Sequence, residues 1–252
     1  MRSGVPVSVV ACIVAARWGC QGEKTATVQG PPLLIPSTNA VASPAPPVDA
    51  RFVEIEPAPQ RLSIGACQQL LVDMVKGAAT ANGEELAEGD VVAVGGVPEL
   101  SVQGAGVAVI ASSRVASCDA GGLSPRKSVV RAGRAPELSF MGGAMHARLD
   151  VDDRSVAPSL YLGRLWGTAA VPEHDHATSW EILCAVDASG TFTLAGQERH
   201  LGPHTCASVP PGAKHAWRPD AGSRLVAIQL YSPPGPEQRF KKLAADEASR
   251  DR

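Results

Sequence analysis

The C-terminal half of the chain alternates hydrophobic and polar positions with the short period of β-strands. Over residues 160–166 the odd-numbered side chains fall on one face of an extended segment and the even-numbered ones on the other. Apolar runs at 181–186, 191–194 and 224–231 follow, separated by segments rich in Gly, Pro, Asp and Ser. The pattern predicts a small antiparallel β-barrel, with a hairpin turn at 187–190 that pairs the runs on either side of it.

Three histidines and one glutamate stand in this region within two motifs. The motifs are His174-x-His176-x4-Glu181, followed by Gly190, and Gly202-x7-Pro210-x-Gly212-x2-His215. Imidazoles at positions i and i+2 of a strand point to one face. Glu181 reaches the same face only if residues 177–180 turn the chain. Three neutral nitrogens and one carboxylate oxygen are a ligand set for a divalent transition metal. We therefore predict a metal site at His174, His176, Glu181 and His215.

The two motifs resemble those of the cupin superfamily, and the resemblance covers residues 160–232. It implies an all-β fold, an antiparallel jelly-roll barrel at residues 136–235, and one divalent ion (Mn, Fe, Zn, Ni or Cu) in its mouth. Both motifs have longer turns than is usual in the family. Insertions are generally tolerated in turns, so the ligand positions are not affected. The superfamily catalyses many reactions and often forms dimers, so the resemblance does not fix the substrate or the oligomeric state.

An earlier set of apolar runs, within residues 51–117, parallels the later one. Residues 86–100 resemble residues 201–215, with Leu100 where His215 stands. This predicts a second, degenerate cupin-like β unit without metal, as in a bicupin. The alternative is a β-rich accessory segment of independent type. The polar residues 118–135 are expected to form a linker between the two units.

Both ends of the chain have their own composition. Residues 1–20 hold an apolar run too short to span a bilayer, which predicts a signal peptide. Cys20 directly after it resembles the lipidated cysteine of bacterial lipoproteins. The alternatives are an ordinary cleaved signal and a misassigned start codon with no export. Residues 21–50, rich in Pro, Ala and Ser, predict an extended tether. Residues 236–252 predict a short helix with a charged tail. The chain is thus expected to be exported to the periplasm, and lipidation would anchor it to the outer membrane.

Several other residues are candidates for supporting roles. Arg164 and Trp166 either line the pocket or serve as a surface arginine and a core tryptophan, and Gln229 is a further pocket candidate. His204 is a candidate for hydrogen bonding to a ligand, whereas His146 and His200 are expected to be structural or exposed. In an oxidising compartment, pairing within Cys67–Cys118 or Cys184–Cys206 is possible.

The amino-acid composition of the chain excludes some classes of function. The formal net charge of −2 gives no basic field for nucleic acid, and the hydrophobic content of 44% is that of a globular chain. No separate general base stands out, which favours metal-centred chemistry. Two functions remain open: a metal-dependent oxygenase, lyase or isomerase acting on a small molecule, and a non-catalytic envelope protein that binds a metal or small ligand. Any contact with a membrane is expected only through a lipid on Cys20.

Overall fold

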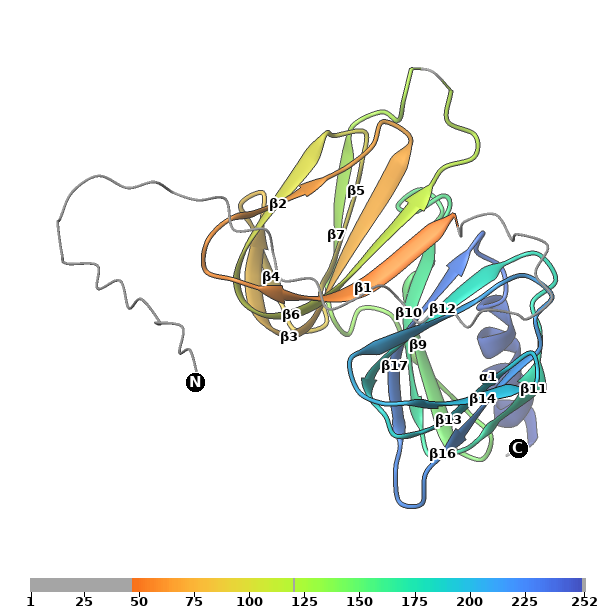
Figure 1. Ribbon diagram of the computed structural model, residues 1–252. Coiled ribbons are helices and arrows are strands. Elements are labelled where there is room, and N and C mark those ends of the chain that lie inside the picture. The colour runs from red at the N-terminus through yellow and green to blue at the C-terminus, as the bar shows by residue number, and fades with distance from the viewer. Residues whose placement is uncertain (1–46, 120, 251–252) are drawn as a thin grey trace, which may run out of the picture.

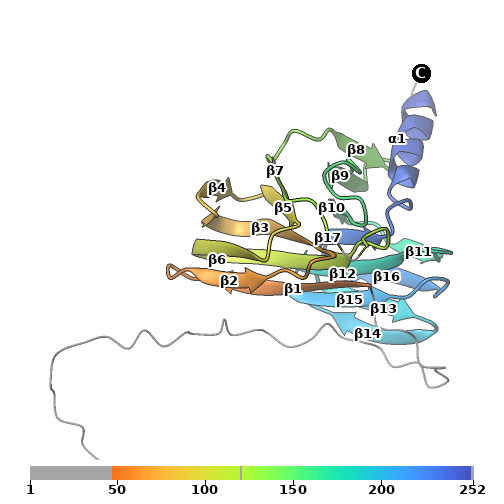
Figure 2. The same cartoon turned by 90° about the horizontal axis from the view of Figure 1, so that it is seen from above.

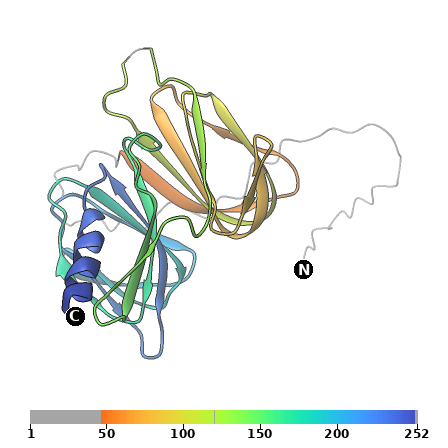
Figure 3. The same cartoon turned by 180° about the vertical axis from the view of Figure 1, so that it is seen from behind.

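The computed structural model describes residues 47–119 and 121–250, and nearly all of its elements are β-strands (Figure 1). The predicted signal peptide and most of the tether lie outside these residues. The strands form two units, and the last element is the helix α1 (Gln238–Arg250). Figures 1 and 3 show α1 along the side of the C-terminal unit that is remote from the N-terminal one. No helix in the described ranges is both long and apolar enough to cross a bilayer.

The first unit is one antiparallel sheet. Its strands are β1 (Val48–Ile55), β2 (Gln60–Ser63), β3 (Gln68–Ala81), β4 (Glu84–Ala87), β5 (Val91–Gly95), β6 (Glu99–Arg114) and β7 (Arg126–Val130). The order is β1-β6-β3-β5-β7, with β2 paired to β6 and β4 to β3. Strand β7 lies in the segment that we expected to be a linker, because its residues complete the ladder of β5. Strand β1 likewise begins three residues before the unit that the sequence predicts.

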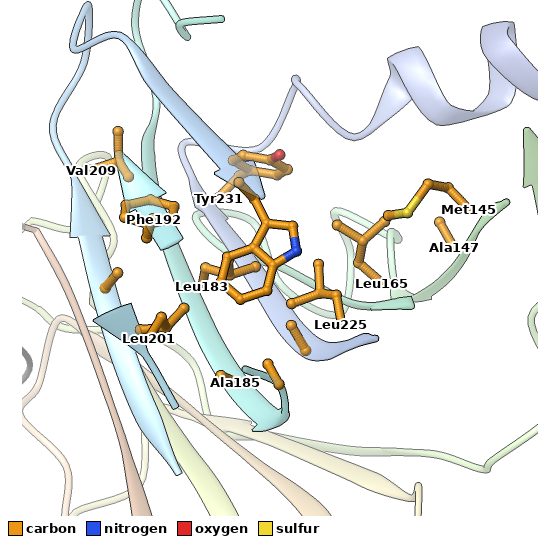
Figure 4. Packing of buried hydrophobic residues seen from close by; sticks show 14 of the residues in the cluster. Met145, Ala147, Leu165, Leu183, Ala185, Phe192, Leu201, Val209, Leu225 and Tyr231 are labelled. Atoms are coloured by element: carbon orange, nitrogen blue, oxygen red, sulfur yellow. The ribbon is translucent and has the colours of Figure 1, made fainter. Parts of the chain in front are cut away.

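The second unit is a barrel of two antiparallel sheets. Its strands are β8 (Glu137–Phe140), β9 (Met145–Val151), β10 (Tyr161–Gly167), β11 (Val171–His174), β12 (Trp180–Asp187), β13 (Gly190–Leu194), β14 (Gln197–Leu201), β15 (Thr205–Val209), β16 (His215–Pro219) and β17 (Leu225–Ser232). One sheet has the order β15-β12-β17-β10-β9-β8 and the other β11-β16-β13-β14. The barrel interior is packed with apolar side chains from both sheets, some of which are labelled in Figure 4.

The hairpin expected at residues 187–190 is wrong. Strands β12 and β13 follow each other in the chain but belong to different sheets, so the segment between them carries the chain across the barrel. The crossing brings Gly190 against the neighbouring strand β16. A Cβ on Gly190 would clash with the carbonyl oxygen of Arg218 and lie 2.6 Å from the Trp217 ring. Glycine is required here because the backbones approach too closely for any side chain.

Replacing Gly190 with alanine is therefore expected to destabilise the protein. The added methyl group forces the backbone of β16 or the Trp217 ring to move, and such overpacking typically costs about 1–3 kcal/mol. Chemical denaturation measures this loss. Gly202→Ala is the matched control, because the nearest atom to its Cβ would be in the His200 ring at 3.8 Å. Equal stability of the two variants would contradict the assigned close approach.

The two units share a hydrophobic core between their sheets. Strands β1, β3, β5 and β6 of the first unit contribute one side of this core, and β9, β10, β12, β15 and β17 contribute the other. Figure 2 shows β1 beside β12 and β15. Along β12, Ile182 and Cys184 face this shared core, whereas Leu183 and Ala185 face the barrel interior. Both faces of the sheet are thus covered, which explains why these strands read as continuous apolar runs.

Strand pairing in the first unit repeats that of the barrel. The pairs β1·β6, β2·β6 and β3·β5 correspond in order to β10·β17, β11·β16 and β12·β15. Strand β3 takes the places of both β12 and β13, since it also pairs with β4 as β13 pairs with β14. Strand β6 does the same for β16 and β17. In the described residues, the pairing among strands β1 to β6 therefore matches that among β10 to β17, whereas β7, β8 and β9 have no counterpart in the other unit.

Two disulfide bonds are present in the described residues. Cys67–Cys118 closes the end of β3 onto the segment after β6, and Cys184–Cys206 joins directly opposed positions of β12 and β15. Both of the pairings that the sequence left open are thus formed. Each bond closes a loop within one unit, so each restricts the unfolded chain and stabilises the folded one.

A buried charge cluster also links the two units. Arg164 on β10 donates a hydrogen bond to Asp73 on β3, and its Nε lies 3.6 Å from Asp150 Oδ2. Asp150 in turn accepts a hydrogen bond from Arg148. The second oxygen of Asp73 is buried without a hydrogen-bond partner. Burial raises the pKa of Asp73 to about 7, although Arg164 acts in the opposite direction.

This raised pKa predicts a loss of stability as the pH rises. Between about pH 4 and pH 7 the folded chain keeps a proton on Asp73 that the unfolded chain has lost, so stability is highest below this window and falls through it. Asp73→Asn removes this contribution. Unfolding free energies at pH 5 and pH 8 should differ more in the parent protein than in Asp73→Asn, by on the order of 2 kcal/mol. An identical pH dependence in both would contradict the assigned protonation.

Candidate metal centre

Four side chains from two sheets converge at one end of the barrel interior. His174 ends strand β11, and His176 follows in the irregular segment that leads to β12. Glu181 is the second residue of β12, and His215 is the first residue of β16. The chain bends at residues 177–178, as the sequence required for Glu181 to face inward. The structure thus brings together all four residues that the two motifs single out, with their ligand atoms all within 4.8 Å of one another.

The two motif loops are tied to each other by the backbone. Gly212, at a φ of 74°, donates its N–H to the carbonyl oxygen of His176 at 2.8 Å. Positive φ is a conformation that glycine adopts at little cost, so the turn before β16 depends on this residue. In the adjacent ladder, His174 stands directly opposite His215, and their ring centroids are 4.1 Å apart. The position of His215 is therefore fixed relative to both histidines of the first motif.

Backbone carbonyls orient two of the imidazoles. His174 Nδ1 lies 2.8 Å from the carbonyl oxygen of Pro172, and His215 Nδ1 lies 3.0 Å from that of Ala213. A carbonyl oxygen only accepts, so Nδ1 carries the proton in both rings and Nε2 keeps its lone pair when the ring is neutral. This is the arrangement found around histidines that bind metals through Nε2.

The carboxylate is held by three neighbours. Oε2 of Glu181 lies 2.9 Å from Nε2 of both His176 and His215, and Oε1 accepts a hydrogen bond from Gln229 at 2.7 Å. Burial opposes ionisation of Glu181, but the two imidazoles outweigh it and hold the pKa of this carboxyl below its ordinary value. Glu181 is therefore a carboxylate at neutral pH. Gln229, a candidate from the sequence, orients it.

The histidines respond differently to this environment. Burial, followed by the neighbouring His215 and Arg239, lowers the pKa of His174 to about 4, so this ring is neutral at physiological pH. Burial also disfavours the charged form of His215, but the adjacent Glu181 outweighs it and the pKa of His215 is raised. A metal ion that takes up this nitrogen must displace its proton, so acid competes with metal binding at this residue.

The donor set fits a divalent transition metal. His176, Glu181 and His215 are at most 7% exposed, and His215 Nε2 is buried without a well-aligned hydrogen-bond partner. A buried polar atom in this state is costly, and a metal ion would satisfy it. A six-coordinate ion held by these four donors has positions left for water or a ligand, and it supplies Lewis-acid or oxygen chemistry when bound.

A cavity of about 580 Å³ opens from these side chains toward α1. His174, Glu181 and His215 form its polar end together with Gln229. Its walls are mainly apolar: Phe140, Met145, Leu165, Val171, Leu183, Phe192, Trp217, Leu225 and Phe240. The volume and the few convergent polar groups are typical of sites for small molecules.

The remaining candidates from the sequence lie outside this cavity. Arg164 is neither a pocket residue nor a surface arginine, because it belongs to the buried charge cluster between the units. Trp166 stacks on His146, which pairs with Glu137. His204 packs on Phe52 of the first unit and does not reach the metal ligands. His200 is exposed, near Ser189 and Asp220.

One residue of the site escaped sequence reasoning. Arg239, in the first turn of α1, points its guanidinium at the ligand cluster and donates a hydrogen bond to His174 Nε2 at 3.0 Å. The sequence predicts the helix but not the surface that it covers. Phe240 stacks on Phe140 at a centroid distance of 5.5 Å, which docks the helix on β8. The spacing of aromatic residues alone does not reveal such a contact.

In the first unit, the positions equivalent to the four ligands are aliphatic. Leu62 stands opposite Leu100 as His174 stands opposite His215, and Leu70 pairs with Val94 as Glu181 pairs with Val209. Ile64 lies two residues after Leu62, at the same spacing as His176 from His174. These four residues all pack in the core of the first unit: Leu62, Ile64, Leu70 and Leu100. None of them offers a donor atom to a metal.

Comparisons with solved structures identify the fold. An IolB-like protein from Salmonella typhimurium has a TM-score of 0.62 and 12% identity, covering 75% of this chain and 84% of that one. A tryptophan-to-tyrosine variant of Bacillus subtilis oxalate decarboxylase has a TM-score of 0.56 and 11% identity, covering 73% and 68%. The formate complex of Lactobacillus farciminis oxalate decarboxylase has a TM-score of 0.56 and 11% identity, covering 75% and 77%.

These similarities show that the chain has the cupin fold, as its two motifs predict. Residues 136–250 make up less than half of the chain, so each match also extends into the first unit. Neither a protein-family model nor a curated protein matches the sequence. At 10–12% identity the neighbours establish architecture, while function rests on this chain's own site.

Proposed function

We propose that this chain is a metal-dependent enzyme of the oxygenase, lyase or isomerase type, acting on a small molecule at the His174, His176, Glu181 and His215 site. The observation that carries the proposal is an N3O donor set, with Nε2 of two histidines pre-oriented by backbone carbonyls, at the polar end of an apolar cavity of about 580 Å³. A metal site that serves only structure is usually closed, whereas this one faces a cavity.

A non-catalytic envelope protein that binds a metal or small ligand is the second candidate. The observation that favours it is that, in the described residues lining the cavity, the carboxylate other than Glu181 is Asp246, which is exposed on α1, so no general base is buried beside the proposed ligands. Such a module would keep the same ion and cavity but release its ligand unchanged.

Manganese is our first choice among the metals that the donor set admits. A neighbouring structure, with a TM-score of 0.53 and 10% identity, describes Mn(II) centres in Bacillus subtilis oxalate decarboxylase. Imidazole and carboxylate ligands suit Mn, Fe, Zn, Ni and Cu, and availability in the compartment decides between them.

The first unit, in this proposal, is a cupin barrel that has lost its metal. The matching strand pairs, the aliphatic residues at the four ligand positions and the extension of each structural match into this unit support that origin. The chain would then be a bicupin with one working centre.

We also propose that the protein works outside the cytoplasm. Two disulfides within the described residues support an oxidising compartment, and the apolar run at residues 1–20 supports export. Attachment to the outer membrane through a lipid on Cys20 is part of this proposal. Mass spectrometry of the purified N-terminal peptide tests it, because lipidation and plain cleavage leave different masses.

Elemental analysis of protein expressed in a periplasm is the test of the proposed metal centre. About one transition-metal ion per chain is expected. A screen of small-molecule substrate classes under air and under nitrogen then separates the two candidates, because an enzyme converts a compound and a binding module returns it unchanged. Protein that stays free of metal after exposure to each of the five ions would overturn the metal-dependent enzyme and any metal-binding module.

A further inference from the structure

We propose that Arg239 is a specificity-determining residue that binds the carboxylate of a small ligand with an apolar body, at the mouth of the metal cavity. The proposal rests on the proposed function in that it assigns a ligand class to the same site. Arg239 lies in the first turn of α1, outside the two sheets that supply the metal ligands.

Among the described residues, the Arg239 guanidinium has no anionic partner. It donates a hydrogen bond to His174 Nε2, and its central carbon lies over the Phe240 ring, 5.4 Å from the centroid. It forms no ion pair with a carboxylate of residues 47–119 or 121–250. The first turn of α1 carries no acidic residue either, so the positive charge faces the positive end of the helix dipole. Helix stability therefore does not explain an arginine at this position.

Metal binding would release this cation toward the cavity. The lone pair of His174 Nε2 accepts the hydrogen bond from Arg239, and the same lone pair is the one that a metal ion would use. One lone pair cannot serve both. In the loaded site the guanidinium is left beside the ion with free N–H donors, and a carboxylate oxygen is the group that these donors bind most strongly.

The rest of the cavity indicates an apolar body on that carboxylate. The walls are aromatic and aliphatic, and the exposed large hydrophobic side chains of the described residues, Met141 at 45% and Leu243 at 41%, both line its outer part. Exposed apolar side chains gathered around one opening mark a binding surface. Lys242 adds a second cation there, against the single carboxylate of Asp246. A cavity with apolar walls and a cationic end is complementary to a small carboxylic acid with an apolar body.

The test compares three probes on as-isolated and manganese-loaded protein by titration calorimetry. Phenylacetate has both the charge and the apolar body, phenylacetamide has only the body, and acetate has only the charge. We expect phenylacetate to bind the loaded protein about ten- to a hundredfold more tightly than either of the others, the range of one to two charge-assisted hydrogen bonds.

Three variants make the assignment specific. Arg239→Gln keeps a polar side chain of similar reach and should erase the preference for phenylacetate over phenylacetamide without lowering the metal content. Arg239→Lys should keep part of the preference for phenylacetate, because the charge remains but bidentate hydrogen bonding to the carboxylate is lost. Arg250→Gln, in the last turn of the same helix, is the control and should bind as the parent does.

The outcomes separate this proposal from the proposed function. Equal binding of the acid and the amide by the parent protein, or a preference that survives Arg239→Gln, overturns the role of Arg239 while the metal centre stands. Conversely, a preference that depends on Arg239 in protein that takes up no metal supports the carboxylate site and overturns the metal-dependent function.

Discussion

Replacement of His174 and His215 by alanine is expected to abolish metal uptake. The two imidazoles face each other across the β11–β16 ladder, and the double variant leaves only His176 and Glu181, which already contact each other at 2.9 Å. Two donors hold a divalent ion far more weakly than four, so the metal content measured by elemental analysis should fall from about one ion per chain to near zero.

The matched control for this prediction is His146→Ala. It removes an imidazole from the same barrel, but one that pairs with Glu137 and stacks on Trp166 outside the cavity. Its metal content should equal that of the parent. The circular dichroism spectrum of the double variant shows whether the fold is retained. Full metal content in a folded His174→Ala, His215→Ala protein would show that the ion binds elsewhere.

Arg164→Ala is expected to have the largest effect on stability. The side chain of Arg164 is 15% exposed and lies between Asp73, at 0%, and Asp150, at 2%. Its removal leaves two buried carboxylates with less compensation, and breaking a buried ion pair in this way typically costs about 3–5 kcal/mol. Chemical denaturation at pH 8, where Asp73 is ionised in the parent protein, measures the loss.

Two further variants test the cause of that loss. Arg126 also crosses from the first unit to the second, through a hydrogen bond of 3.3 Å to the carbonyl oxygen of Ser155, but at the solvent-exposed edge. Arg126→Ala should cost less than about 1 kcal/mol. Adding Asp73→Asn to Arg164→Ala should recover part of the stability, because one uncompensated carboxylate is removed. A double variant less stable than Arg164→Ala would argue against electrostatics as the cause.

The features that local sequence predicts well are those fixed by short-range geometry. The alternation over residues 160–166 places Tyr161 and Leu165 in the barrel interior and Leu162 in the shared core, as strand periodicity requires. The convergence of His174, His176, Glu181 and His215 was also predictable, because these residues stand in the two motifs that resemble those of cupins. Leu100, predicted from the internal repeat to replace His215, occupies the equivalent place in the strand ladder.

The sequence predictions that failed concern contacts between segments far apart in the chain. A strand, a short turn and another strand look like a hairpin, yet residues 180–187 and 190–194 join different sheets, because their partners are chosen by tertiary packing. The charges of Arg126 and Lys127 made β7 look like a linker, although an edge strand often carries such residues. Arg239 could not be assigned, since nothing near it in the sequence says where α1 docks.

The hydrophobic layer shared by the two units limits how this molecule can be divided. A fragment beginning at residue 136 would retain every proposed metal ligand, yet it would expose Leu162, Ile182, Ile228 and Leu230 to water. The fragment would then be less soluble than the whole chain, although its proposed metal ligands would be unchanged. The first unit thus acts as a cover that keeps the apolar outer face of the C-terminal barrel from aggregating.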